Sequence, residues 1–253
     1  ISGMVHSDLG FERNNILRLY TGWMAFPGQD EVYDYVPIFE SLPQEFRKEA
    51  GSGITDAIAM NSDIFNPVTK HYISVWTEEE LAEGKENYDG DYNQVRYAEI
   101  PFRAMAFFGI KSKDGAMLSP KAEQAGKLQI MFNGSAMQAF NVGNVRKSQL
   151  YTGRMMGNEN CCFWGGDELA HYDHQALNIV GEANIRLSDF HHGEEAMMLV
   201  GVPEDHLCRF KEHDAVYIKY EEGKRKEAEA AVRRVLSRFD VPEEKIMLSS
   251  LDE

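Results

Sequence analysis

Two adjacent glutamates, Glu194 and Glu195, precede an apolar segment over residues 196–200, which Gly201 and Pro203 then bring to an end. A short apolar run bounded by glycine and proline is typical of a buried strand. A carboxylate at the end of such a rigid element can face a cleft and stabilise a positive charge that develops on a substrate. The segment therefore predicts a catalytic carboxylate, with Glu195 as the candidate.

A serine is the second candidate, because Ser119 and Pro120 have the pattern of a helix start. The hydroxyl caps free N–H groups, and proline fits the first helical position. Residues 127–132 then alternate like a strand, so that a serine, a helix and a strand follow one another. Ser74, in another predicted strand, is an alternative to Ser119 that the sequence leaves open.

These segments resemble the mono-ADP-ribosyltransferase superfamily. That family has an arginine on a strand, then a serine motif, then a glutamate-led strand, and Arg18, Ser119 and Glu195 occur here in the same order. In the family the arginine usually follows the aromatic residue directly, where this chain has Thr21. The resemblance implies an ADP-ribosyltransferase-like fold.

The resemblance also implies a reaction, the transfer of ADP-ribose from NAD to a protein or other macromolecular acceptor, or the hydrolysis of NAD. The chain would then be a transferase of the glycosyltransferase kind, with NAD as its substrate and no metal. Glu195 would stabilise the ribose cation and Ser119 would order the site. Arg18 would bind the phosphates through its planar fork of donors. Tyr20 and Trp23 would flank the nicotinamide.

Two other functions stay open. His171 and Asp173 form a His-x-Asp pair that could hold a metal ion in a metal-dependent enzyme. A non-enzymatic structural or interaction subunit, such as an assembly or capsid-associated protein, fits the 12 methionines, which suit adaptable interfaces as well as a core.

Composition limits the partners and the compartment. The 41 acidic and 26 basic residues give a formal net charge of -15, which disfavours nucleic acid as a partner. The basic run at residues 224–226 is interleaved with acids on a predicted helix, which indicates a solvated face.

No apolar stretch approaches the roughly 18 residues of a spanning helix, so a soluble protein with no membrane partner is expected. Three cysteines and the absence of a signal sequence predict a cytoplasmic protein.

The pattern of elements predicts an α+β fold, with a mixed or antiparallel sheet and flanking helices. One domain over residues 1–253 with long inserted loops is expected, with a possible boundary near 145–150. A capping box of Thr77 and Glu80 predicts a helix start, and the segment from Pro27 to Pro43 is expected to be mixed loop and short helix. The other predicted elements are strands at 16–20, 71–75, 127–132, 196–200, 207–210, 216–220 and 245–249 and a helix at 223–239.

Overall fold

The computed structural model describes residues 10–21, 36–60, 72–85, 94–119, 127–142, 149–153, 174–186, 188–189, 193–203 and 215–252. The chain divides into two compact units. The sheet unit consists of residues 1–63, 106–109 and 203–253, and the barrel unit consists of residues 64–105 and 110–202. One domain over the whole chain stays a prediction, and most of the predicted boundary near 145–150 lies outside the described residues.

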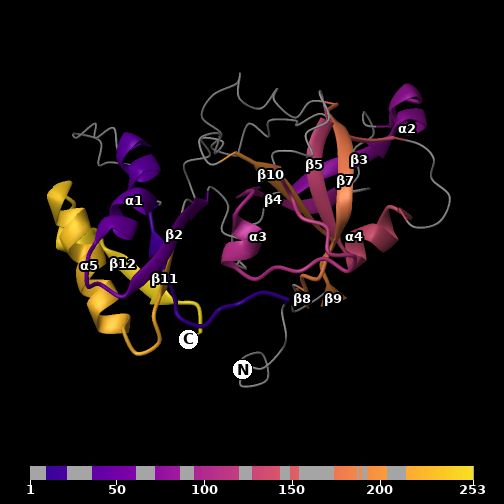
Figure 1. Ribbon diagram of the computed structural model, residues 1–253. Coiled ribbons are helices and arrows are strands. Elements are labelled where there is room, and N and C mark those ends of the chain that lie inside the picture. Colours follow the sequence, from indigo (N-terminus) through magenta and orange to yellow (C-terminus); the bar gives the residue numbers. More distant parts are fainter. Residues whose placement is uncertain are drawn as a thin grey trace. The chain divides into compact units, whose positions relative to one another are not determined.

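The sheet unit has four strands and two long helices in the chain order β1 (Ile16–Tyr20), α1 (Val36–Lys48), β2 (Ile54–Met60), β11 (Ala215–Tyr220), α5 (Arg225–Arg238) and β12 (Met247–Ser250). The strands lie in the order β12-β1-β11-β2, and all neighbours are antiparallel. The connection through α1 therefore joins β1 to β2 past β11, and the connection through α5 joins β11 to β12 past β1. This is the split βαβ arrangement of ferredoxin-like domains. Figure 1 shows α1 and α5 beside this sheet.

The core of the sheet unit lies between one face of the sheet and the two helices. Leu17 and Leu19 of β1 and Val216 of β11 point to this face and are fully buried. The predicted strand at 16–20 and the predicted helix at 223–239 are confirmed. The apolar stripe of that helix is buried as its 3.6-residue period predicts, and it consists of Ala228, Ala231, Val232, Val235 and Leu236.

Helix α1 corrects the prediction of loop and short helix before Pro43. The helix runs over 13 residues and has Pro43 inside it. Proline removes one helical hydrogen bond and normally kinks or ends a helix. Here Leu42 and Phe46, on either side of the proline, are fully buried against the sheet. Tertiary packing of this face offsets the local cost.

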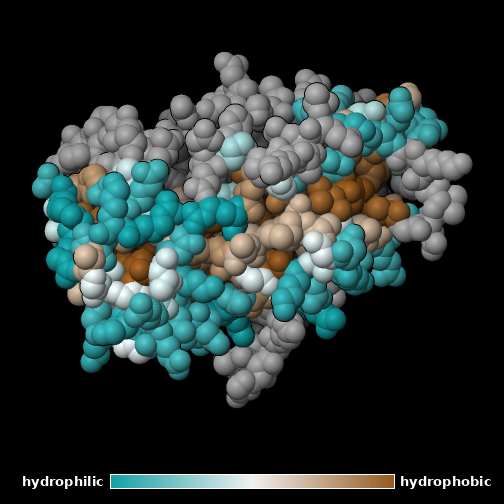
Figure 2. All heavy atoms as spheres, in the orientation of Figure 1, coloured by the Kyte–Doolittle hydropathy of each residue, from teal (hydrophilic) through white to brown (hydrophobic). Residues whose placement is uncertain are grey.

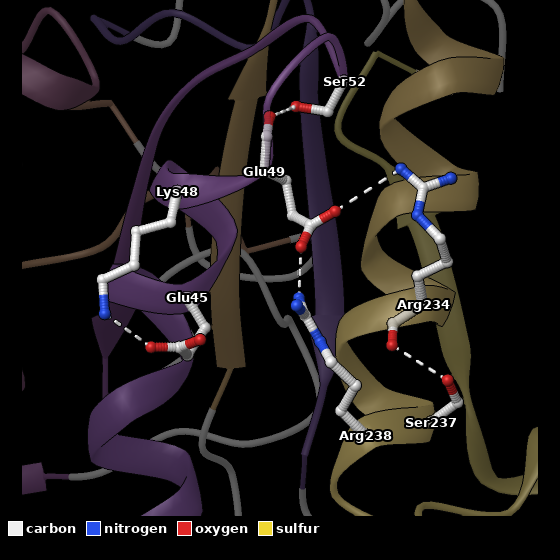
Figure 3. A network of polar contacts seen from close by, with 7 residues as sticks. All are labelled: Glu45, Lys48, Glu49, Ser52, Arg234, Ser237 and Arg238. Atoms are coloured by element: carbon white, nitrogen blue, oxygen red, sulfur yellow. Dashed lines mark hydrogen bonds and ion pairs between the residues drawn. The ribbon is translucent and has the colours of Figure 1, made fainter.

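Polar side chains join the two helices at the surface, which is mostly hydrophilic over this unit (Figure 2). Glu49, directly after α1, accepts a short hydrogen bond from Arg238, and its other carboxylate oxygen lies 3.5 Å from Arg234 (Figure 3). Arg234 and Arg238 are one helical turn apart on α5, so both reach one carboxylate. This arrangement ties the end of α1 to α5.

The basic run at the start of α5 is paired with acids on the same helix. Lys224 lies 3.1 Å from Glu227, and Arg225 lies 2.8 Å from Glu229. The Lys224 ammonium lowers the pKa of Glu227 by hydrogen bonding to its charged form. These pairs agree with the solvated helix face that the sequence predicts.

The barrel unit is a closed sheet of six strands, β3 (Tyr72–Thr77), β4 (Gln94–Pro101), β5 (Lys127–Asn133), β6 (Leu150–Thr152), β7 (Ala176–Ala183) and β10 (Met197–Val202). Their order around the barrel is β10-β4-β3-β6-β7-β5, and β5 pairs again with β10. The pairs β4–β10 and β5–β7 are parallel and the other pairs are antiparallel. The predicted α+β class with mixed and antiparallel sheets is thus confirmed at the coarse level.

Smaller elements complete the chain: α2 (Glu78–Ala82), α3 (Ala104–Phe107), α4 (Gly134–Ala139), the short strands β8 (Ser188–Asp189) and β9 (Gly193–Glu194), and a 3₁₀ helix (Glu243–Lys245). The predicted capping box is confirmed, because Thr77 and Glu80 each bond the main chain of the other. The predicted strand at 207–210 lies outside the described residues.

The contact of Glu49 with two arginines predicts a measurable effect on stability. We expect Glu49→Gln to lower the free energy of unfolding by about 1 kcal/mol, because Glu49 is mostly buried while its partners are half exposed. Urea denaturation followed by circular dichroism measures this change. Glu45→Gln, which removes the pair with exposed Lys48, is the matched control and should cost less. Equal losses for the two variants would contradict this role of Glu49.

Candidate functional site

Polar side chains surround Glu195, a predicted site residue that lies two residues before β10. The Tyr72 phenol donates a short hydrogen bond to one carboxylate oxygen of Glu195. A guanidinium nitrogen of Arg96 lies 3.5 Å from the other oxygen. The Arg96 and Glu195 side chains are 6% and 13% exposed, so this pair is largely shielded from water. Both oxygens of the predicted catalytic carboxylate are engaged.

Strand register explains why these residues meet. Tyr72 at the start of β3 is the cross-strand partner of Arg96 on β4. Arg96 is in turn the partner of Met197 at the start of β10. These residues therefore lie at the same end of the barrel, and Glu195 lies beside Arg96 there. Tyr72 is 42% exposed, whereas Arg96 beside it is only 5% exposed.

Asn133 holds the main chain of the same segment. Its side-chain oxygen accepts from Ala136, where it caps α4 at 3.0 Å, and from Met197 at 2.9 Å. Its side-chain nitrogen donates to the main-chain oxygen of Glu195 at 2.7 Å. Because Asn133 is only 2% exposed, these bonds form in a water-poor environment, where leaving a polar group unpaired is costly.

We call Tyr72, Arg96, Asn133 and Glu195 the β10 clasp. It fixes the segment before β10 by side chain and by main chain at once. β10 is the last of the six barrel strands along the chain, and it pairs with β4 on one side and with β5 on the other. The chemistry of the clasp is therefore the anchoring of a closing strand by one ion pair and several hydrogen bonds.

Ser119 lies in the same unit but contacts a different part of β5. Its main-chain N–H donates to Gln129 at 2.5 Å, and its main-chain oxygen accepts from Gln129 at 2.7 Å. Gln129 and Asn133 are four residues apart on β5, which is roughly 13 Å along a strand. Ser119 and Glu195 thus contact different residues of β5, Gln129 and Asn133 respectively. Pro120 and the helix predicted after it lie outside the described residues.

The segment before Ser119 contacts the C-terminal end of β7 through residues 111–116. The Lys113 N–H donates to the Glu182 carbonyl at 3.1 Å, and the two side chains form an ion pair at 2.5 Å. The lack of a side chain at Gly181 leaves room for Ala116, because a Cβ at position 181 would lie 3.0 Å from the Ala116 side chain. The Ala116 N–H donates to Asp114 and lowers the pKa of that carboxyl.

The residues predicted to bind NAD are in the other unit or outside the described part. Arg18 and Tyr20 lie on β1, and the Arg18 guanidinium donates to the Ser249 hydroxyl at 3.2 Å. Trp23 lies outside the described residues. The structure assigns Arg18 a cross-strand contact with β12.

Three members of the clasp were missed by sequence reasoning. Asn133 lies at a recognisable strand end followed by glycine, but that pattern indicates a turn and gives no sign of the α4 cap. Arg96 and Tyr72 carry no local signal, because strand register alone makes them neighbours.

Histidine and aspartate at positions 171 and 173, the alternative metal pair, lie outside the described residues. Among the residues that the structure does describe, no three His, Cys, Asp or Glu side chains are grouped so that they could hold a metal ion. None of the helices in this part of the chain combines the length and the apolar character needed to cross a membrane.

Similarity to known proteins is found at the level of the fold. No protein-family model matches the chain, and no curated protein matches its sequence. The periplasmic region of MacB from Actinobacillus actinomycetemcomitans is 10% identical with a TM-score of 0.53, over 98% of this chain and 93% of that chain. The extracellular domain of the noncanonic ABC-type transporter YknZ from Gram-positive bacteria is 13% identical with a TM-score of 0.51, over 92% of this chain and 100% of that chain.

These similarities correct four predictions. The chain does not have an ADP-ribosyltransferase-like fold, and the predicted ADP-ribosyl transfer or NAD hydrolysis is wrong, as is the description of the chain as a transferase or glycosyltransferase. The predicted cytoplasmic location is also wrong, since the similar structures are periplasmic and extracellular regions. The physical reason is that the order of three short motifs along a sequence does not determine whether they meet in space.

The individual site assignments depended on that resemblance. NAD as a ligand, and the roles of Glu195, Ser119, Arg18, Tyr20 and Trp23, are not tested by these findings and stay predictions without the family that suggested them. The contacts described above give Glu195, Ser119 and Arg18 structural partners.

The β10 clasp predicts that Asn133 is important for the stability of the barrel unit. We expect Asn133→Ala to lower the free energy of unfolding by about 3 kcal/mol, because it removes a helix cap and leaves buried main-chain groups unpaired. Gln138→Ala, at an exposed position of α4, should change it by less than about 0.5 kcal/mol. Chemical denaturation of both variants measures the difference. A loss for Asn133→Ala no larger than that of the control would contradict the clasp.

Proposed function

We propose that this chain is an extracytoplasmic region of an ABC-type transporter and that it acts by binding protein partners. It would thus belong with the non-enzymatic interaction proteins that the sequence left open as an alternative. The observation that carries the proposal is the similarity of fold to regions of two transporters, one periplasmic and one extracellular, over at least 92% of this chain.

The extent of the similarity is what gives it weight. A ferredoxin-like sheet is common to many proteins, so a match to the sheet unit alone would carry little functional meaning. Coverage of 98% and 92% of this chain, however, requires that both the sheet unit and the barrel unit have counterparts in the same order. The insertion of a six-stranded barrel between the second and third strands of such a sheet is a more specific arrangement.

The contacts of Glu195 give the predicted catalytic acid a structural role. A catalytic carboxylate needs an oxygen that faces substrate. In this chain Tyr72 bonds one oxygen of Glu195, and Arg96 approaches the other. Glu195 thus helps to hold the segment before β10 through these two partners.

The proposed location leads to a direct test in the native host. An antibody raised against this chain is used to follow its product in separated membrane and soluble fractions. We expect the signal in the membrane fraction, on a polypeptide larger than the 28.8 kDa of this chain. Protease added to intact spheroplasts should remove the signal, because the proposal puts the described units outside the cytoplasmic membrane.

A cytoplasmic marker protein serves as the internal control, and its signal should survive the same protease treatment. If the product instead is recovered in the soluble fraction and stays protected together with the marker, the proposed function is wrong. Affinity purification from solubilised membranes, after chemical crosslinking of intact cells, then identifies the protein partners. If the protein is recovered from crosslinked cells without any protein attached to it, the result would argue against the binding role.

A further inference from the structure

The outermost strand of the sheet unit is β2, which pairs with β11 along one edge. Within the part of the chain that the structure describes, no strand pairs with its other edge. Free edges expose N–H and C=O groups that can template another strand, and proteins that avoid aggregation protect such edges. The opposite edge of the sheet is β12, whose four residues offer only a short template.

The hydrogen bonds between β11 and β1 show which main-chain groups of β2 face the free edge. The Tyr220 N–H donates to the Asn15 oxygen at 2.9 Å, so these two residues form a hydrogen-bonded pair between β1 and β11. Such pairs recur at every second residue of an antiparallel ladder. Ile218 therefore bonds Leu17, and its N–H and C=O point away from β2.

Ala57 of β2 is the cross-strand partner of Ile218. Because the main-chain groups of Ile218 are directed to β1, the pair of Ala57 and Ile218 is a non-hydrogen-bonded one. The N–H and C=O of Ala57 consequently point to the free edge. Ala57 is the middle residue of the seven in β2, so an added strand would have to pair with these groups.

Both of these groups are already bonded within the chain. The Ala57 N–H donates to the Asp56 carboxylate at 2.8 Å, and the Ala57 oxygen accepts from the Arg47 guanidinium at 3.0 Å. Arg47 and Asp56 also lie 3.5 Å from each other as an ion pair. One side chain from the last turn of α1 and one from β2 itself therefore cap the centre of the edge.

We propose that Arg47 and Asp56 form an edge guard, which prevents β2 from pairing with β2 of a second copy of this chain. When the same edge strand from two copies pairs in antiparallel orientation, the two copies are related by a two-fold axis, which is the commonest symmetry of protein dimers. A second copy of β2 is therefore the simplest partner for this edge. The guard blocks it in two ways. It satisfies the N–H and C=O of Ala57 at the centre of the edge, and it places two charged side chains where a second strand would lie. This inference does not depend on the proposed function.

The test removes the guard from the whole chain with Arg47→Ala and Asp56→Ala together. We expect the double variant to self-associate, with a dimer dissociation constant at least about tenfold below that of the wild type, measured by analytical ultracentrifugation over a range of concentrations. Far-UV circular dichroism should stay unchanged. An unchanged association constant in a folded double variant would overturn the proposal.

The matched control is the double variant Glu45→Ala and Lys48→Ala. These two side chains lie on the same helix, but they pair with each other at 2.7 Å rather than with β2 (Figure 3). We expect the association of this variant to equal that of the wild type. If both double variants associate equally, the effect comes from loss of surface charge, and the edge guard is wrong.

Two further variants test whether β2 is the strand that pairs, and they keep the test decisive if the double variant misfolds. Asp56→Ala alone removes the acceptor of the Ala57 N–H and the ion-pair partner of Arg47, but it keeps the Arg47 bond to the Ala57 oxygen. It should shift association in the same direction by a smaller factor, and it tests the proposal even if the double variant fails to fold. Ala57→Pro added to a self-associating variant removes the edge N–H and should restore the wild-type mass, since proline is tolerated at strand edges. Association that persists after the Ala57→Pro substitution would show that another surface is responsible and would overturn the proposal.

Discussion

Cross-strand pairing of Met60 with Ala215 is the contact on which the arrangement of the chain depends. These residues end β2 and begin β11, which are neighbours in the sheet, yet the barrel unit occupies most of the sequence between them. Because the two ends of the insertion lie on adjacent strands, the insertion takes the place of a hairpin loop. The entropy of closing a long loop grows only slowly with its length, and the inserted residues form a compact unit of their own.

The barrel unit solves a related problem, because a closed sheet needs its last strand to be placed accurately. β10 has a parallel neighbour on one side and an antiparallel neighbour on the other, so neither a hairpin nor a single crossover sets its register. The β10 clasp supplies this placement through Asn133 and Glu195. A closed barrel removes free edges, whereas the sheet unit keeps two among the described strands. The inferred guard of Arg47 and Asp56 protects one of them, and β12 is short.

Local patterns predicted the elements whose side chains bury one face. The helix α5 has a regular apolar stripe and the strand β1 is rich in apolar residues, and both were confirmed with nearly the predicted bounds. Strand β4 was missed because both of its faces are covered, which buries Arg96 and Glu99 nearly as fully as Ile100. Helix α1 was missed because Pro43 disrupts its local pattern, while the packing of its neighbours decides its conformation.

The sequence by itself determined the α+β class, several element bounds and the solvated character of the basic run on α5. These properties depend on contacts within one element or between residues a few positions apart. Only the tertiary structure decided that Glu195 contacts Tyr72 and Arg96, that Ser119 contacts Gln129, and that Arg18 belongs to the other unit. The physical reason is that strand register joins residues far apart in the chain, and no local pattern encodes that register. The order of motifs along a sequence therefore could not predict a shared site.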